Sequence, residues 1–205
     1  GRPPAVVGSV QDFARRPAHN GPMTETSERY RRNAEAFARA VSAVPDGRWT
    51  DPSPCEDWDA RAVVAHVVDS HAMFERLVGR ELRPGPSAAD DPSGAAAAAF
   101  RQVQAELDDP VLADVEFDGF MGRTTFARAV DQFLSFDLVV HRWDLAHATG
   151  GDQQLSPEEV ARAWQDVEVL GEAIRSPGAF GPAVEPPPGA DEQTRLLAFL
   201  GRRSG

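Results

Sequence analysis

The segment from residue 133 to residue 146 constrains the fold of this chain more than any other. It reads FLSFDLVVHRWDLA, and a helix drawn through it is apolar on both sides. Such a helix is expected in a protein interior rather than on its surface. The few ionisable residues within it, Asp137 and His141 among them, would then be buried and would need partners.

Other segments show apolar residues at helical spacing, separated by clusters of Pro, Gly and Asp. The predicted helices span residues 25–44, 59–79, 94–107, 125–149, 156–175 and 191–200. Residues 111–124 alternate in polarity and predict a short extended segment or hairpin, and residues 176–190 predict coil. The predicted fold class is therefore mostly α, a four-helix bundle with an additional C-terminal helix.

The chain length of 205 residues is enough for one domain with a proper core. Residues 1–22 are rich in Pro, Gly and Arg, and Met23 precedes a helix-start signal. We therefore expect an N-terminal extension over 1–22 and a single helical domain over 23–205.

Composition narrows the expected partners and location. The chain has 21 basic and 32 acidic residues, and its net charge of -11 argues against nucleic acid as a partner. We expect no membrane association, because no apolar run is long enough to span a bilayer. The single cysteine, Cys55, excludes an intramolecular disulfide and favours a reducing compartment, so a cytoplasmic location is expected.

Asp137 and His141 are four residues apart, so on a helix their side chains project from one face. His66 lies in a second apolar helical run, AVVAHVV at residues 62–68. Three nitrogen and oxygen donors from two facing helices would form a metal site with at least one open position. We therefore predict that His66, Asp137 and His141 bind a divalent metal.

The more ordinary interpretation is that these are histidines satisfied within the core, and chance often supplies an Asp-x-x-x-His spacing. A buried carboxylate without a partner is unfavourable, however, which favours pairing or metal binding for Asp137. Asp144, three residues after His141, is predicted either to support the site or to pair with an arginine. Cys55 could act as a nucleophile, but a loop thiol packed under a tryptophan is the favoured interpretation.

The remaining candidates are weaker. His71 is five residues after His66 and is turned well away from the same helix face. His147 lies near a helix end, where a contact with the helix dipole is the expected role. Asp69, three residues after His66, is likewise predicted either to support the site or to pair with an arginine.

Several motifs together resemble the mycothiol-dependent maleylpyruvate isomerase-like family, within the DinB-like metal-binding four-helix bundles. They are WTDPSPCEDW at 49–58, Val64-Ala-His66, VHRWDLAHATG at 140–150, PGAFGPAV at 177–184 and RLLAFLGR at 195–202. The resemblance covers residues 24–203, and its tail fits a subgroup without an assigned reaction.

The resemblance implies a metal, usually zinc, bound by one histidine of the second helix and an acid-x-x-x-His pair of a later helix. These positions fall on His66, Asp137 and His141, although the isomerase has glutamate where this chain has Asp137. Ni²⁺, Fe²⁺ and Mn²⁺ also accept such donors. Mycothiol is the implied co-substrate, acting on a small electrophile.

The sequence leaves several functions open. The favoured hypothesis is a metal-dependent thiol (mycothiol) transferase or thiol-assisted isomerase. Alternatives are a non-catalytic metal-binding or stress-response module, a metal-dependent hydrolase that uses bound water, and a bundle whose polar trio only pairs internally. The sequence also leaves open the electrophile and whether the chain forms a homodimer.

Overall fold

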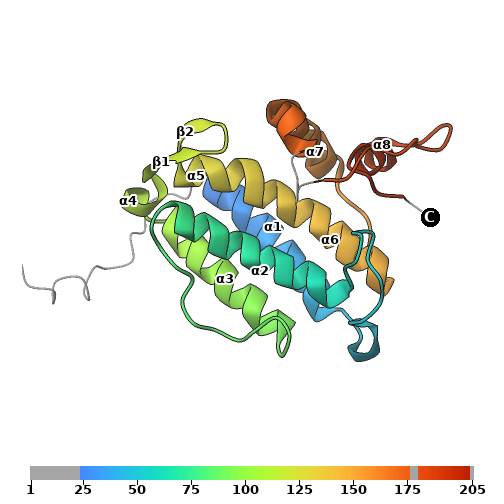
Figure 1. The fold of residues 1–205 in the computed structure, drawn as a ribbon, viewed down its shortest axis with the longest axis horizontal. Helices are drawn as coiled ribbons and strands as arrows, with labels where there is room; N and C mark the ends of the chain where they lie inside the picture. The colour runs from blue at the N-terminus through green and yellow to red at the C-terminus, as the bar shows by residue number, and fades with distance from the viewer. Residues whose placement is uncertain (1–23, 176–179, 204–205) are drawn as a thin grey trace, which may run out of the picture.

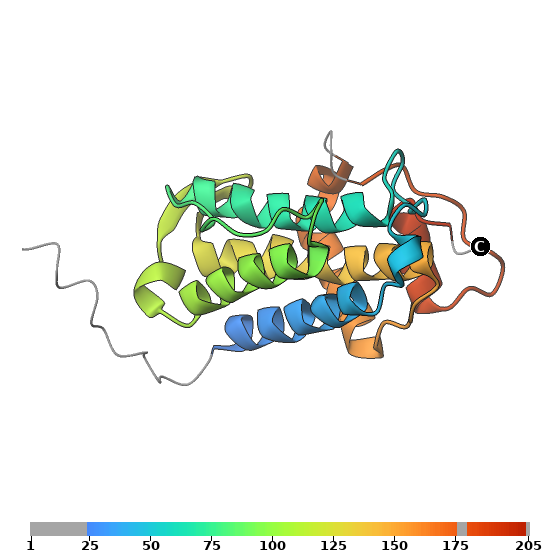
Figure 2. The same cartoon turned by 90° about the horizontal axis from the view of Figure 1, so that it is seen from below.

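The computed structural model describes residues 24–175 and 180–203, and its core is a bundle of four helices (Figure 1). These are α1 (Glu25–Ser42), α2 (Ala60–Leu77), α3 (Pro92–Leu107) and α6 (Ser135–Thr149). Helices α1 and α2 each pack against both α3 and α6, as the two views in Figures 1 and 2 show. The mostly helical bundle predicted from the sequence is confirmed, whereas the predicted extension over 1–22 lies outside the described residues.

Short polar side chains begin three of the four core helices. Thr24, Asp59 and Asp91 each accept a hydrogen bond from the backbone N–H three residues later, which satisfies one free donor of the first turn. Because Asp91 caps α3, that helix begins at Pro92 rather than at the predicted Gly94. Gly150 ends α6 with φ of 72°, a left-handed conformation that glycine adopts without strain.

The helix predicted over 125–149 consists of three consecutive helical pieces. They are α5 (Phe126–Ala129), a π-helical turn (Val130–Leu134) and α6. The wider π turn inserts an extra residue into the helix, and such turns occur often beside functional sites. The turn lies immediately before the segment that carries Asp137 and His141.

Helix α6 is buried on both sides. Leu138 and Leu145 point into the bundle core, whereas Phe136 and Trp143 belong to a second apolar cluster on the opposite side. That second cluster is built with α7 (Pro157–Leu170) and α8 (Glu192–Phe199), which pack against each other. The two C-terminal helices therefore cover the face of α6 that the bundle leaves free (Figure 1).

Helix α7 ends five residues earlier than predicted. Gly171 has φ of 51° and ends the α-helix, and a 3-10 turn follows over Gly171–Arg175. Residues 180–190 contain no helix or strand, as expected for this stretch, whereas 176–179 lie outside the described residues. The described helices include none that is long and apolar enough to cross a membrane.

A two-stranded hairpin lies at one end of the bundle. Strand β1 (Glu116–Gly119) pairs antiparallel with β2 (Gly122–Thr125), with Phe117 opposite Thr124. The hairpin predicted within 111–124 is thus confirmed. The short helix α4 (Pro110–Ala113) was not predicted: Asp109 caps it and Pro110 begins it, so the residues that end α3 also start a new helix.

A buried ionic cluster joins α2 to α3. Glu75 is fully buried, and its Oε2 lies 3.3 Å from Arg80 Nε, while Arg80 Nη1 lies 3.0 Å from Glu106 Oε2. Two carboxylates thus share one guanidinium. Burial, and then the negative charge of Glu106, raise the pKa of Glu75 from 4.5 to about 8.

This raised pKa predicts how the stability of the protein depends on pH. Between pH 4.5 and about 8 the folded chain keeps a proton on Glu75 that the unfolded chain releases. The contribution of Glu75 to stability is therefore complete below pH 4.5 and is lost as the pH rises through about 8. Because glutamine does not ionise, we expect Glu75→Gln to reduce the loss of unfolding free energy between pH 4.5 and about 8 by more than about 1 kcal/mol. Urea unfolding at several pH values across this range measures the loss. The exposed Glu168→Gln is the control, and equal pH slopes for both variants would contradict the prediction.

Candidate metal centre

The structure brings His66, Asp137 and His141 together across the contact between α2 and α6. One donor atom from each side chain lies within 4.8 Å of the others. His141 Nε2 is 3.1 Å from Asp137 Oδ1, and His66 Nε2 is 3.7 Å from Asp137 Oδ2. The two imidazole rings meet edge to face, with their centroids 4.8 Å apart. The juxtaposition expected from the sequence is present, while metal binding itself stays a prediction.

The trio is open on one side. The side chains of His66 and Asp137 are 28% and 20% exposed, whereas that of His141 is only 5% exposed. A ligand can therefore approach from the side of His66, while His141 forms the floor of the site. This is the arrangement expected where three protein groups leave a position for an exchangeable ligand.

Asp144 fixes the orientation of His141 from the buried side. Its Oδ2 lies 2.9 Å from His141 Nδ1, and the carboxylate also binds the guanidinium of Arg202 through two contacts. Arg202 Nη2 is 2.8 Å from Oδ2, and Nε is 3.1 Å from Oδ1. Asp144 therefore has both of the roles that the sequence offered as alternatives.

The charges of the trio require a cation or a proton between the side chains. Because Asp144 accepts a hydrogen bond from His141 Nδ1, the neutral imidazole presents the lone pair of Nε2 to Asp137. An ionised carboxylate there can only accept, so the two acceptors repel unless something positive lies between them. Within the described residues, Asp137 Oδ2 is also buried without a hydrogen-bond partner.

The pKa values of the pair reflect the same geometry. Burial lowers the pKa of His141, but the charge of Asp137 and its hydrogen bond outweigh burial and raise the pKa well above its usual value. Burial raises the pKa of Asp137, but His141 and then His66 outweigh it and hold that pKa well below its usual range. Independently of these pKa values, the orphaned Oδ2 and the two imidazole nitrogens are donors of the kind that a divalent metal accepts.

The loop before α2 covers the site. Asp57 adopts a left-handed backbone conformation, with φ of 63°, in the turn between Cys55 and Trp58. The Trp58 ring lies 4.6 Å from the ring of His66 and 6.0 Å from that of His141, measured between centroids. The two tryptophans of this loop, Trp49 and Trp58, both pack against the apolar cluster of the bundle.

Cys55 makes contacts that the sequence analysis did not predict. Its Sγ lies 3.3 Å from Asp144 Oδ2 and 3.5 Å from Arg202 Nη2. Cys55, His141 and Asp144 therefore also form a group whose donor atoms lie within 4.8 Å of one another. Because Asp144 is fully buried and already paired with Arg202, this group is less suited to a metal than the trio with Asp137.

The other two histidines within the described residues, His71 and His147, have structural partners. His71 is buried, donates through Nδ1 to the carbonyl of Val67 and accepts from the hydroxyl of Tyr30, at 2.7 and 2.9 Å. Burial lowers its pKa to about 4. His147 stacks on Trp143 and contacts Gln153 through Nδ1, at 3.0 Å. Both lie outside the trio, as expected, and Asp69 is exposed on α2.

The chain is similar to known proteins over most of its length. Residues 30–146, which include the whole trio, match the family described as the mycothiol maleylpyruvate isomerase N-terminal domain. The chain belongs to this family. Two uncharacterised proteins from two strains of Mycobacterium tuberculosis are each 31% identical to it over 188 residues, which span 84% of this chain and 95% of theirs.

Solved structures support the fold of this family member. A crystal structure of the mycothiol-dependent maleylpyruvate isomerase is similar, with a TM-score of 0.51 and 18% identity over 84% of this chain and 80% of that one. The structure of a histidine mutant of that isomerase gives the same TM-score at 17% identity and the same coverage. At these identities the likeness concerns the fold.

The ion pair between Asp144 and Arg202 can be tested through stability. Removing one partner of a buried pair leaves an uncompensated charge, so Arg202→Met is expected to lower the free energy of unfolding by about 3 kcal/mol. The adjacent Arg203 is exposed, and Arg203→Met serves as the matched control. Urea unfolding measures both, and a loss equal to that of the control would show that the pair does not stabilise the fold.

Proposed function

We propose that this protein is a divalent-metal-dependent thiol transferase or thiol-assisted isomerase, with mycothiol as co-substrate and a small electrophile as substrate. The observation that carries the proposal is the open trio of His66, Asp137 and His141, with its orphaned buried carboxylate oxygen. Membership of the mycothiol maleylpyruvate isomerase N-terminal domain family supports a thiol as the ligand.

The side chains have separable roles in this proposal. His66, Asp137 and His141 would hold the metal, and zinc is favoured, although Ni²⁺, Fe²⁺ and Mn²⁺ also suit imidazole and carboxylate donors. When bound, such a metal supplies the positive charge that favours the thiolate form of a thiol at neutral pH. Asp144 keeps the Nε2 of His141 directed at the site, and outer partners of this kind raise metal affinity.

The surroundings of the trio suit chemistry that involves a thiolate. Trp58 covers the two imidazole rings and excludes water from one side, while the partial exposure of His66 leaves an entry. Addition of sulfur to a carbon–carbon double bond makes it a single bond, about which the substrate rotates before the thiol is eliminated. In a transferase, the conjugate is instead released as the product.

Metal binding is tested on the purified protein. We expect about one equivalent of metal per chain by elemental analysis after purification without chelators, and its loss in His66→Ala and His141→Ala, because each removes one of only three donors. His147→Ala is the matched control, since His147 lies outside the trio but on α6, the helix that carries His141. A wild-type protein without metal would favour a trio that only pairs internally.

A thiol-binding experiment distinguishes the proposed enzyme from a hydrolase and from a non-catalytic metal-binding module. We expect isothermal titration of the metal-loaded protein with mycothiol to show saturable binding, and Asp137→Asn, which weakens the metal site, to abolish it. Bound metal without thiol binding would contradict the proposal. In that case hydrolysis in a screen of esters and amides would indicate a hydrolase, and its absence would indicate a non-catalytic metal-binding module.

A further inference from the structure

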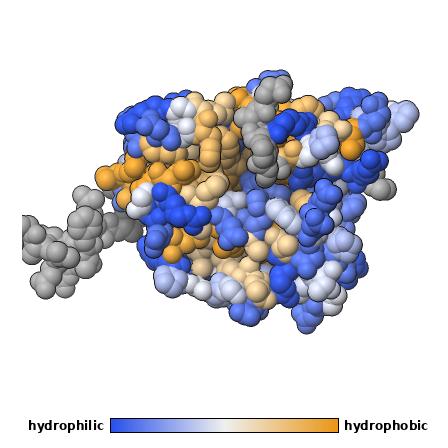
Figure 3. Space-filling model, in the orientation of Figure 1, coloured by the Kyte–Doolittle hydropathy of each residue, from blue (hydrophilic) through white to orange (hydrophobic). Residues whose placement is uncertain are grey.

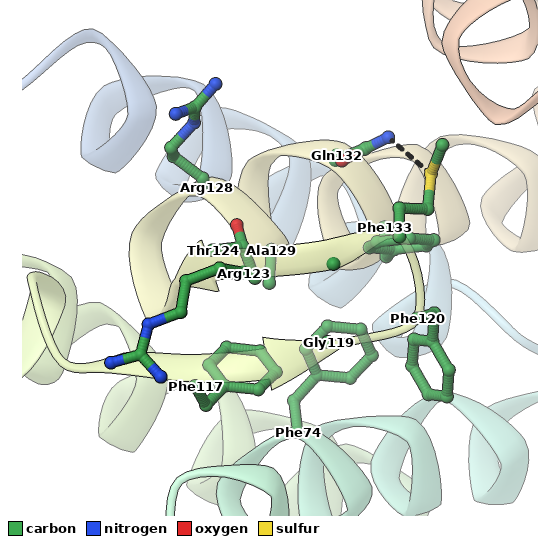
Figure 4. Close-up of a pocket in the computed structure, with 12 residues that line it drawn as sticks. Phe74, Phe117, Gly119, Phe120, Arg123, Thr124, Arg128, Ala129, Gln132 and Phe133 are labelled. Carbon is green, nitrogen blue, oxygen red and sulfur yellow. Dashed lines mark hydrogen bonds between the residues drawn. The ribbon is translucent and has the colours of Figure 1, made fainter.

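A cavity of about 160 Å³ lies between the hairpin, the end of α2 and the π-helical turn. Figure 4 shows the rings of Phe74, Phe117, Phe120 and Phe133 gathered around it. The ring of Phe120 is 6.5 Å from that of Phe74 and 5.8 Å from that of Phe133, and Phe74 and Phe133 are 5.9 Å apart, measured between centroids. Four phenylalanine rings thus line the cavity, together with residues of the hairpin and of the segment 128–132.

Two phenylalanines of the cavity, Phe74 and Phe133, lie on the chain segments that also carry the metal trio, namely α2 and the π-helical turn that continues into α6. On α2, His66, Ser70 and Phe74 follow one another at intervals of four residues. On α6 and the π-helical turn before it, His141, Asp137 and Phe133 are also spaced by four, in the opposite direction.

The two ends of these rows meet across the contact. The rings of His66 and His141 are 4.8 Å apart, and those of Phe74 and Phe133 are 5.9 Å apart. At 1.5 Å per residue, the aromatic pair therefore lies roughly 6 to 12 Å from the metal trio. This separation is within the length of a small organic molecule.

The mouth of the cavity carries exposed apolar side chains. Phe120 and Met121 both line the cavity and are 63% and 51% exposed. Figure 3 shows apolar surface at the same end of the molecule as the hairpin in Figure 1. Large side chains of this kind gathered in one region often mark a binding site.

The two arginines that line the cavity do not place a free positive charge among its phenylalanine rings. Arg123 is paired with Glu116 and with Asp118, at 3.0 and 3.6 Å. Arg128 points away from the phenylalanine rings in Figure 4. The rings therefore meet no unpaired guanidinium that would select a carboxylate, and the wall suits an uncharged, flat group.

We propose that this cavity binds a single aromatic ring of the substrate, whose electrophilic carbon lies at the metal centre. The inference rests on the proposed function and adds to it the substrate class, an aryl-substituted electrophile. The volume supports one ring, because an apolar protein cavity on the order of 150 Å³ is known to hold benzene. Ring-to-ring contacts with Phe74, Phe120 and Phe133 would supply the preference for an aromatic group.

The first experiment locates the ring without using activity. Crystals are soaked with 4-iodobenzyl alcohol, whose iodine scatters anomalously, and its dissociation constant is measured in solution by titration. We expect iodine between Phe74, Phe120 and Phe133, and binding weakened roughly three- to tenfold in Phe120→Ala. Phe120 is largely exposed, so the variant should fold, and Val169→Ala, an exposed apolar residue on α7, is the control.

Two results would overturn the assignment of the cavity. One is the absence of iodine there in wild-type crystals, and the other is equal affinity of wild type and Phe120→Ala. Metal content and mycothiol binding are measured on the same preparations. Their loss would contradict the proposed function, whereas their presence without ring binding would contradict the aryl substrate alone.

A second experiment tests the connection between the two sites. 4-Phenylbutane-1-thiol carries a thiol and a ring separated by a chain of suitable length. On the metal-loaded protein it is expected to bind at least tenfold more tightly than butane-1-thiol or 4-phenylbutan-1-ol, because the second contact becomes intramolecular. Phe120→Ala should reduce this advantage. Equal affinities of the two thiols would show that the cavity does not serve the metal centre.

Discussion

A helix that is buried on both faces cannot carry ionisable side chains unless each has a partner, and α6 carries several. Asp137 and His141 contact each other, Asp144 binds Arg202, and Arg142 pairs with Glu159. The candidate metal centre is the place where this pairing is incomplete within the described residues, because Asp137 Oδ2 has no hydrogen-bond partner. The ionisable side chains of buried α6 therefore require partners from the surrounding segments, and the candidate metal centre lies where one such partner is missing within the described residues.

The C-terminal segment is part of this arrangement. Helices α7 and α8 cover the apolar face of α6 opposite the bundle, and the chain after α8 brings Arg202 to Asp144. Asp144 in turn contacts His141. Packing in the second apolar cluster and orientation of a donor in the trio are therefore coupled through one buried carboxylate, which explains why a residue far along the chain belongs to the site.

Much of the fold follows from local patterns. Helix periodicity, caps such as Asp59 and Ser156, and the glycine at 150 act within a few residues, so they can be recognised in the sequence. The differences between the predicted and the observed helices have local reasons as well. Gly171 ends α7 early because of its backbone conformation, and Asp109-Pro110 starts a short helix that overlaps the segment predicted to be extended. No residue pattern within 125–149 predicted the π-helical turn, so the sequence indicated one continuous helix there.

The sequence by itself determined the four bundle helices, the burial of α6 and the candidate donors, because a spacing of four residues places Asp137 and His141 on one helix face. Only the tertiary structure decided what surrounds them. Arg202 and Cys55 contact Asp144 behind His141, and Trp58 packs against the rings of His66 and His141, all through contacts between segments distant in sequence. The aromatic cavity forms where the hairpin meets α2 and the π turn. Such contacts depend on how helices pack, which no spacing along the chain records.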